Sequence, residues 1–294
     1  MTRPHAAPAP APDHWWWSQV SEHAAETHHA TLRDARVHYR RWSGDGPLLL
    51  FVHGFRGHTH WWDWIAPSFA TDHEVVAIDL SGMGDSDWRA AYEEECFADD
   101  VLGLIEHLGR PATVIGHSFG GTQLLRACAR DSTAGVSRIA RGIVVDTWVR
   151  VLDEPPYTPS TRARETGPYP DFETARSRFR LNPVQPVADA AMLEHIARHS
   201  VRTRDGLWQW KFDPKLEGTF IRDPRSLLRS IETPLDIVHG EHSRVMTRER
   251  AEACVGLLRH GRGPVTIPAA RHHMMFDQPV ALVATLRALR ALRR

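Results

Sequence analysis

The chain has 294 residues, 42% hydrophobic and 24% charged, which is enough to form one large globular domain with or without an insertion. Its 36 basic residues balance its 36 acidic residues, so no excess of charge indicates nucleic acid or an anionic membrane surface as a partner. Three cysteines without a C-x-x-C spacing argue against a disulfide framework. We therefore expect a cytoplasmic protein with buried or half-buried thiols.

Residues 1–30 begin with a run of alternating proline and alanine. This run lacks the apolar core of a signal peptide, and no stretch of 18 apolar residues follows it. We predict a mobile tail and a leading segment over residues 1–30, and no membrane-spanning helix. The 19 histidines lack the spacing of a metal-binding motif, so we expect neither a metal ion nor another cofactor.

Apolar runs alternate with helical patterns along most of the chain, which is typical of an α/β protein with a mostly parallel sheet. Residues 31–42 alternate in polarity like an antiparallel hairpin at a sheet edge. The apolar runs predict strands over 47–54, 73–82, 111–118, 141–148, 233–242 and 263–273. Helical spacing predicts helices over 97–109, 120–131 and 279–294.

The alternation stops between residues 148 and 230, where prolines are frequent and two helical patterns cover 171–180 and 189–200. An aromatic run with Trp208, Trp210 and Phe212 follows, too apolar for a solvated linker. We predict a helical cap, or lid, over residues 148–230, inserted into a core formed by residues 31–147 and 231–294.

Four motifs carry a resemblance to a known family. Gly116-His117-Ser118-Phe119-Gly120, between an apolar strand and a helix, resembles the nucleophile elbow of α/β-hydrolases. Residues 53–57 resemble the family's H-G-x-x-G loop, and residues 79–86 its D-x-x-G-x-G-x-S turn. Near the end, a histidine seven residues before Pro279 matches the terminal histidine motif, and that spacing selects His272, not His273. The resemblance covers roughly residues 31–294.

This resemblance implies an α/β-hydrolase fold: a mostly parallel sheet flanked by helices, with an inserted helical cap. It also implies that Ser118 is a nucleophile with His272 as its general base, and that the amides of Phe55 and Phe119 form an oxyanion hole. We expect His117 to support packing, and the carboxylate of Asp79 to bind loop amides.

The family's catalytic triad also contains an acid that orients the histidine, and here this chain departs from the family pattern. After the strand over 233–242 the family has G-x-x-D, whereas this chain has Gly240-Glu241-His242-Ser243. Without an acid the histidine would lack a fixed tautomer, at a cost of about 10⁴ in rate. Asp146, at the end of the strand over 141–148, and Glu241 are the two replacements. We favour Asp146 because a short carboxylate on a rigid strand end orients an imidazole with little loss of entropy.

The resemblance therefore implies a serine hydrolase that cleaves a small-molecule carboxylic ester, or a lactone, through an acyl-enzyme. Trp208, Trp210 and Phe212 of the cap, and Trp61 after the oxyanion loop, are candidates for the substrate pocket. The alternatives are a hydrolase of carbon–carbon bonds in ring-cleavage products and a binding protein that kept the fold without catalysis. We expect a monomer or a homodimer.

Overall fold

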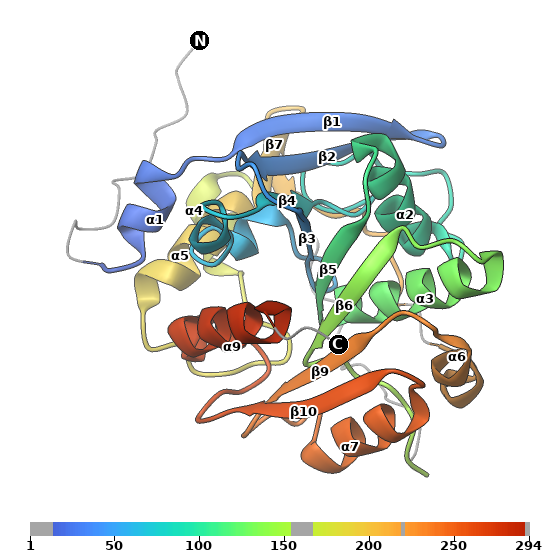
Figure 1. Ribbon diagram of the computed structural model, residues 1–294. Coiled ribbons are helices and arrows are strands. Elements are labelled where there is room, and N and C mark those ends of the chain that lie inside the picture. The colour runs from blue at the N-terminus through green and yellow to red at the C-terminus, as the bar shows by residue number, and fades with distance from the viewer. Residues whose placement is uncertain (1–13, 154–166, 219–220, 292–294) are drawn as a thin grey trace.

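Residues 14–153, 167–218 and 221–291 are described by a computed structural model (Figure 1). Its main sheet has eight strands in the order β1-β2-β4-β3-β5-β6-β9-β10. β2 runs antiparallel to β1 and β4, whereas the pairs from β4 to β10 are parallel, which confirms the predicted α/β-hydrolase fold. The strands are β1 (Glu26–Leu32), β2 (Ala35–Trp42), β3 (Leu48–Val52), β4 (Glu74–Ile78), β5 (Ala112–His117), β6 (Ile139–Val145), β9 (Leu235–Gly240) and β10 (Gly261–Ile267).

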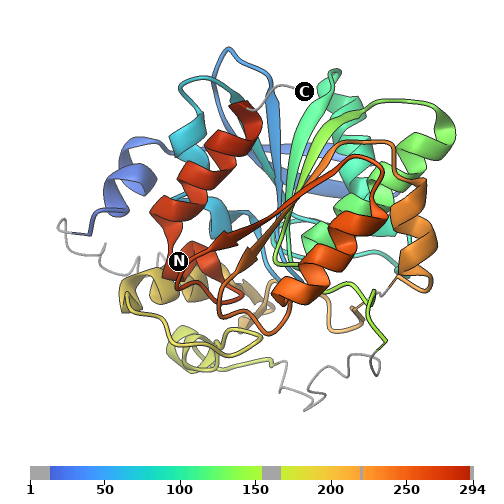
Figure 2. The same ribbon diagram turned by 60° about the horizontal axis from the view of Figure 1, so that its bottom comes forward.

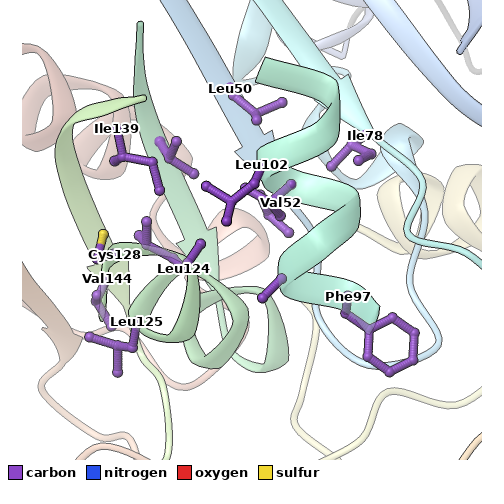
Figure 3. Close-up of a cluster of buried hydrophobic side chains, with 14 of the residues drawn as sticks. Leu50, Val52, Ile78, Phe97, Leu102, Leu124, Leu125, Cys128, Ile139 and Val144 are labelled. Carbon is purple, nitrogen blue, oxygen red and sulfur yellow. The ribbon is translucent and has the colours of Figure 1, made fainter. Parts of the chain in front are cut away.

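Both faces of the sheet are buried, which explains why the central strands are apolar without alternation. In β3, Leu48, Leu50 and Val52 join one apolar cluster, while Leu49 and Phe51 join the cluster on the opposite face. Figure 3 shows part of the first cluster, between the sheet and the helices α2 and α3. The helices of this face are α2 (Cys96–Leu108), α3 (Phe119–Ala134), α6 (Pro224–Ser230) and α7 (Arg248–Leu257).

The second face is covered by elements from distant parts of the chain. These are α1 (Trp17–Glu22), the 3-10 helices η1 (Thr59–Trp62) and η2 (Ala66–Phe69), and the helices α8 (Met274–Asp277) and α9 (Pro279–Ala291). Trp16 is fully buried here and donates its indole N–H to Asp189 at 2.8 Å. The leading segment is therefore packed from Trp16 onward, and residues 1–13 of the predicted tail and leading segment lie outside the described residues.

Between β6 and β9 lies the predicted insertion, residues 148–230, which we call the cap segment. It contains α4 (Phe172–Ser177), α5 (Ala190–His199) and also a hairpin of β7 (Val201–Arg204) and β8 (Leu207–Trp210) that the helical patterns do not predict. It ends with α6, which packs against α3 and α7 on the first face of the core. The turn of this hairpin is Asp205-Gly206, both with positive φ, the preferred chemistry of a two-residue hairpin turn. In Figure 2 the yellow helices of the cap segment lie at one end of the sheet.

All three cysteines, Cys96, Cys128 and Cys254, are free and buried, as predicted. Within the described ranges, no helix combines the length and the apolar character needed to cross a membrane.

Candidate active site

Ser118 lies at the tight turn from β5 into α3, with φ 54° and ψ −120°. A non-glycine residue with positive φ is strained, and such strain persists only where the surroundings hold it. The flanking glycines allow the turn because a Cβ atom on Gly116 would lie 2.5 Å from the carbonyl oxygen of Gly120. A Cβ atom on Gly120 would likewise lie 2.4 Å from the carbonyl oxygen of Val52. The spacing of the motif is thus a consequence of backbone crowding.

The structure brings Ser118, His272 and Asp146 into one line of hydrogen bonds. Nε2 of His272 lies 3.0 Å from Oγ of Ser118, and Nδ1 of the same ring lies 2.7 Å from Oδ1 of Asp146. The side chains of His272 and Asp146 are 4% and 0% exposed, so water does not compete for these bonds. Each residue follows the carboxyl end of a parallel strand, where α/β sheets place their sites.

The carboxylate of Asp146 has more partners than His272 alone. Its Oδ1 also accepts a hydrogen bond from Oγ of Ser243 at 2.6 Å, and its Oδ2 accepts one from the amide of Gly240 at 2.9 Å. In the sequence, Ser243 stands out only as the residue at which the family has its aspartate. Its position in the G-x-x-D pattern was a signal that this side chain lies beside the histidine.

Glu241, the alternative acid, points elsewhere. Its Oε2 accepts a hydrogen bond from the amide of Ala269 at 2.8 Å, and its side chain is 51% exposed. Ala269 has φ 55°, so this bond supports a strained turn after β10. Glu241 therefore has a structural partner of its own, and His272 bonds to Asp146 instead.

The amides of Phe55 and Phe119 are positioned by the ends of β3 and β5. Gly54 lies close to the elbow, since a Cβ atom on it would lie 3.4 Å from Cβ of Ser118. The rings of Phe55 and Phe119 pack edge to face with centroids 5.3 Å apart. In the described part of the chain neither amide donates a hydrogen bond, so both N–H groups are free for a ligand oxygen.

Two further histidines surround His272 without joining the line of hydrogen bonds. Nε2 of His117 donates to the carbonyl oxygen of His272 at 3.0 Å. The amide of His273 donates to Oε1 of Gln185, a cap residue, at 2.8 Å, and its Nε2 lies 3.2 Å from the carbonyl oxygen of Pro183. Burial, and then the neighbouring His272, lower the pKa of both His117 and His273 well below the usual value. Both rings are therefore neutral supports, and Gln185 is a contact that sequence reasoning missed.

Asp79 binds loop amides, as expected: Oδ1 accepts from Thr59 at 2.6 Å and Oδ2 from Asp85 at 2.9 Å. Burial alone would raise the pKa of Asp79, but the hydrogen bond and charge of His38 hold the pKa below its usual value. These bonds fix the loop that runs from Phe55 into η1.

The four aromatic pocket candidates fall into two groups. Trp208 contacts the ring of Phe172, and Trp210 contacts the ring of Tyr169. Both tryptophans therefore pack in a small apolar cluster of the cap segment. Phe212 lies beside the oxyanion loop, where Cζ of the Arg56 guanidinium lies 4.6 Å from the centroid of the Phe212 ring. Trp61 contacts His273 at 5.3 Å between ring centroids. Phe212 and Trp61 thus lie next to the loops that carry the site.

The parallel sheet, the strained serine turn and the histidine after the last strand define the class of α/β hydrolases. The family model described as "Alpha/beta hydrolase family" matches residues 49–286, and the chain belongs to that family.

Two relatives cover most of the chain. The esterase Rv0045c of Mycobacterium tuberculosis is 24% identical over 257 residues, which span 85% of this chain and 84% of that protein. The 2-(acetamidomethylene)succinate hydrolase of Mesorhizobium japonicum is 27% identical over 255 residues, 80% of this chain and 84% of that protein. A crystal structure of E-2-(acetamidomethylene)succinate hydrolase has a TM-score of 0.74 at 20% identity and covers 91% of this chain and 100% of its own.

Proposed function

We propose that this protein is a serine hydrolase that cleaves a carboxylic ester, or a lactone, through an acyl-enzyme. The observation that carries the proposal is the line of hydrogen bonds from Ser118 through His272 to Asp146, at 3.0 and 2.7 Å. A serine hydroxyl becomes nucleophilic when an adjacent base accepts its proton and a third group orients that base. The similarity to an esterase over 85% of the chain supports the same class of reaction.

In the first half of the reaction, Oγ of Ser118 attacks the ester carbonyl carbon while Nε2 of His272 accepts the hydroxyl proton. Asp146 accepts the Nδ1–H of His272 and stabilises the imidazolium that forms. The carbonyl oxygen becomes an oxyanion between the amides of Phe55 and Phe119, and losing one such donor typically costs about 3–4 kcal/mol. His272 then gives its proton to the leaving alkoxide, and the acyl-enzyme remains.

In the second half, a water molecule attacks the acyl carbon while His272 accepts one of its protons. The tetrahedral intermediate collapses, the bond to Oγ of Ser118 breaks, and His272 returns the proton to the serine. The products are a carboxylic acid and the free enzyme, so the cycle needs no cofactor. Arg56, Phe212 and Trp61 lie beside these groups and are our candidates for substrate contacts.

A second candidate is the hydrolysis of a substrate that carries carboxylates. It is favoured by the similarity to a 2-(acetamidomethylene)succinate hydrolase in both sequence and fold, together with the guanidinium of Arg56 beside Phe55. A hydrolase of carbon–carbon bonds would use the same three residues. A panel of neutral esters, lactones, carboxylate-bearing amides and a dienone acid separates these possibilities by rate.

The proposal is tested by labelling the wild type and Ser118→Ala with a fluorophosphonate and by assaying p-nitrophenyl ester hydrolysis. We expect labelling and turnover only in the wild type, and equal melting temperatures for the two proteins. Labelling that survives the substitution would move the nucleophile to another residue. A folded wild type that neither labels nor turns over would support a binding protein instead.

A further inference from the structure

Three imidazoles that the proposed reaction does not use meet where the cap segment packs on the core. His60 comes from η1, directly after the oxyanion loop, and His195 and His199 come from α5. One ligand nitrogen of each ring lies within 4.8 Å of those of the other two. Residues four apart on a helix share one face, and histidine pairs with this spacing bind metal ions in helical sites.

Each of these rings already has one nitrogen held by an acceptor. Oδ2 of Asp63 lies 2.8 Å from Nδ1 of His60 and 2.8 Å from Nε2 of His195. Nδ1 of His199 lies 2.8 Å from the carbonyl oxygen of His195. Such bonds fix the tautomer of metal-binding histidines and leave the lone pair on the opposite nitrogen. Within the ranges that the structure describes, Nε2 of His60 and Nε2 of His199 have no hydrogen-bond partner.

Asp63 is suited to support such a site because its carboxylate is buried and paired with a cation. Its side chain is 3% exposed and forms an ion pair with Arg40. Nη1 of Arg40 also lies 3.1 Å from Nδ1 of His60, but both atoms carry protons, so each donates to the carboxylate. Burial alone would raise the pKa of Asp63, yet the hydrogen bonds from His60 and His195 and the charge of Arg40 hold the pKa well below the usual value. The carboxylate therefore remains charged behind the imidazoles.

The imidazoles of His60 and His199 are neutral at pH 7, which is the form that binds metal ions. Burial lowers the pKa of His60. Burial and the neighbouring imidazoles of His60 and His195 lower the pKa of His199 to about 2. A neutral nitrogen cluster backed by one carboxylate favours a transition metal over Mg²⁺ or Ca²⁺, which prefer oxygen ligands.

We propose that His60, His195 and His199 form a binding site for a divalent transition metal ion such as Zn²⁺. The rings of His60 and His199 are stacked, with centroids 3.7 Å apart and an angle of 21° between their planes. Binding therefore requires the partly buried ring of His199 to turn until its free nitrogen faces the ion, at the usual Zn–N distance of about 2.0–2.1 Å. The ion would join α5 of the cap segment to the loop that carries Phe55.

The test uses the full chain, stripped with a chelator and titrated with Zn²⁺ alone in a calorimeter. We expect one ion per chain, a higher melting temperature with Zn²⁺, and visible absorption of tetrahedral Co²⁺ when cobalt replaces zinc. His199→Ala should weaken binding by about a hundredfold and abolish the thermal shift, since one of three protein ligands is lost. His260→Ala, which removes a histidine at the surface, should change neither.

His60→Gln provides a second variant if His199→Ala does not fold. Absence of stoichiometric binding to the wild type would overturn the proposal. So would equal affinity of the folded variants and the wild type, because the ion would then bind elsewhere, for instance at the cluster of His117, His272 and His273. Binding and melting are measured without substrate, so they are independent of the proposed ester hydrolysis.

Discussion

Oγ of Ser243 donates to Oδ1 of Asp146 at 2.6 Å, on the same oxygen that accepts the hydrogen bond from Nδ1 of His272. The family pattern places its acid at residue 243, while this chain places a carboxylate at residue 146. Residues 146 and 243 therefore both lie beside the imidazole of His272. They follow the ends of two neighbouring strands, β6 and β9. The role of the acid can therefore be tested by substitutions at residue 146 and at residue 243.

We expect Asp146→Asn to lower kcat for a p-nitrophenyl ester by about 10³–10⁴, because His272 loses its fixed tautomer. Asparagine tolerates the positive φ of 47° at this position, so the turn should persist. Glu241→Gln is the matched control and should lose less than about tenfold, since Glu241 bonds to Ala269. Steady-state kinetics check both variants, and the opposite ranking would assign the acid to Glu241.

Ser243→Ala should lower kcat by no more than about tenfold. Asp146 keeps its bonds to His272 and to the amide of Gly240, so its carboxylate remains in place. A carboxylate at residue 243 should substitute for Asp146 once room is made. We expect Asp146→Gly to be nearly inactive and the added Ser243→Asp to recover at least about tenfold of kcat. No recovery in a folded double variant would show that residue 243 does not reach the imidazole.

His272→Ala should abolish turnover, whereas His273→Ala should retain it with reduced stability. Only His272 lies 3.0 Å from Oγ of Ser118; His273 instead binds the cap segment through Gln185 and Pro183. The two variants are compared by kcat and by melting temperature. Loss of turnover in His273→Ala alone would mean that the spacing to Pro279 selects the wrong histidine.

The parts of this site that the sequence predicted are those encoded by local spacing. The elbow around Ser118 requires glycines at fixed positions because the backbone is crowded there, so the motif is visible in a single stretch. Buried strands such as β3 are visible because both of their faces are apolar. The seven-residue spacing to Pro279 likewise depends on one short segment.

The missed parts depend on contacts between distant residues. Asp146 and Ser243 lie 97 positions apart, and Gln185 and His273 lie 88 apart, so no local pattern records either pair. The cluster of His60, His195 and His199 has the same origin, because only the packing of α5 on η1 unites it. The hairpin turn at Asp205-Gly206 is different: its sequence carries the signal of a two-residue turn, and its strands are simply short.

We expect one aromatic residue of the cap segment to contribute mainly to stability and another mainly to substrate selectivity. Trp210 is 8% exposed and packs among Tyr169 and other cap residues, so Trp210→Ala should cost about 3–5 kcal/mol of unfolding free energy. Phe212 lies beside Arg56 at the oxyanion loop, so Phe212→Ala should change the preference for acyl chain length more than it lowers stability. Denaturant unfolding and an ester panel measure the two effects. A chain-length shift in Trp210→Ala without loss of stability would place Trp210 in the pocket.

Buried neutral histidines should make stability fall in mild acid. Burial is the largest cause that lowers the pKa of eight histidines, namely His29, His53, His58, His60, His73, His117, His199 and His273. Their unfolded pKa is about 6.5, so above about pH 7.5 neither state binds protons at these rings and their contribution to stability is constant. Below it the unfolded chain binds protons that the folded chain does not, and stability decreases as the pH falls.

Each histidine whose folded pKa lies far below 6.5 should lower the free energy of unfolding by about 1.4 kcal/mol at pH 5.5. Asp63 and Asp79 do not contribute in this window, because their lowered pKa affects stability only below about pH 4. We expect the urea midpoint to fall steadily from pH 6.5 to 5.5 in buffer with a chelator. His199→Gln should lower the proton uptake on unfolding by up to about one, whereas Ser118→Ala should leave it unchanged. A midpoint that stays constant from pH 7.5 to 5.5 would mean that these rings are protonated in the folded protein.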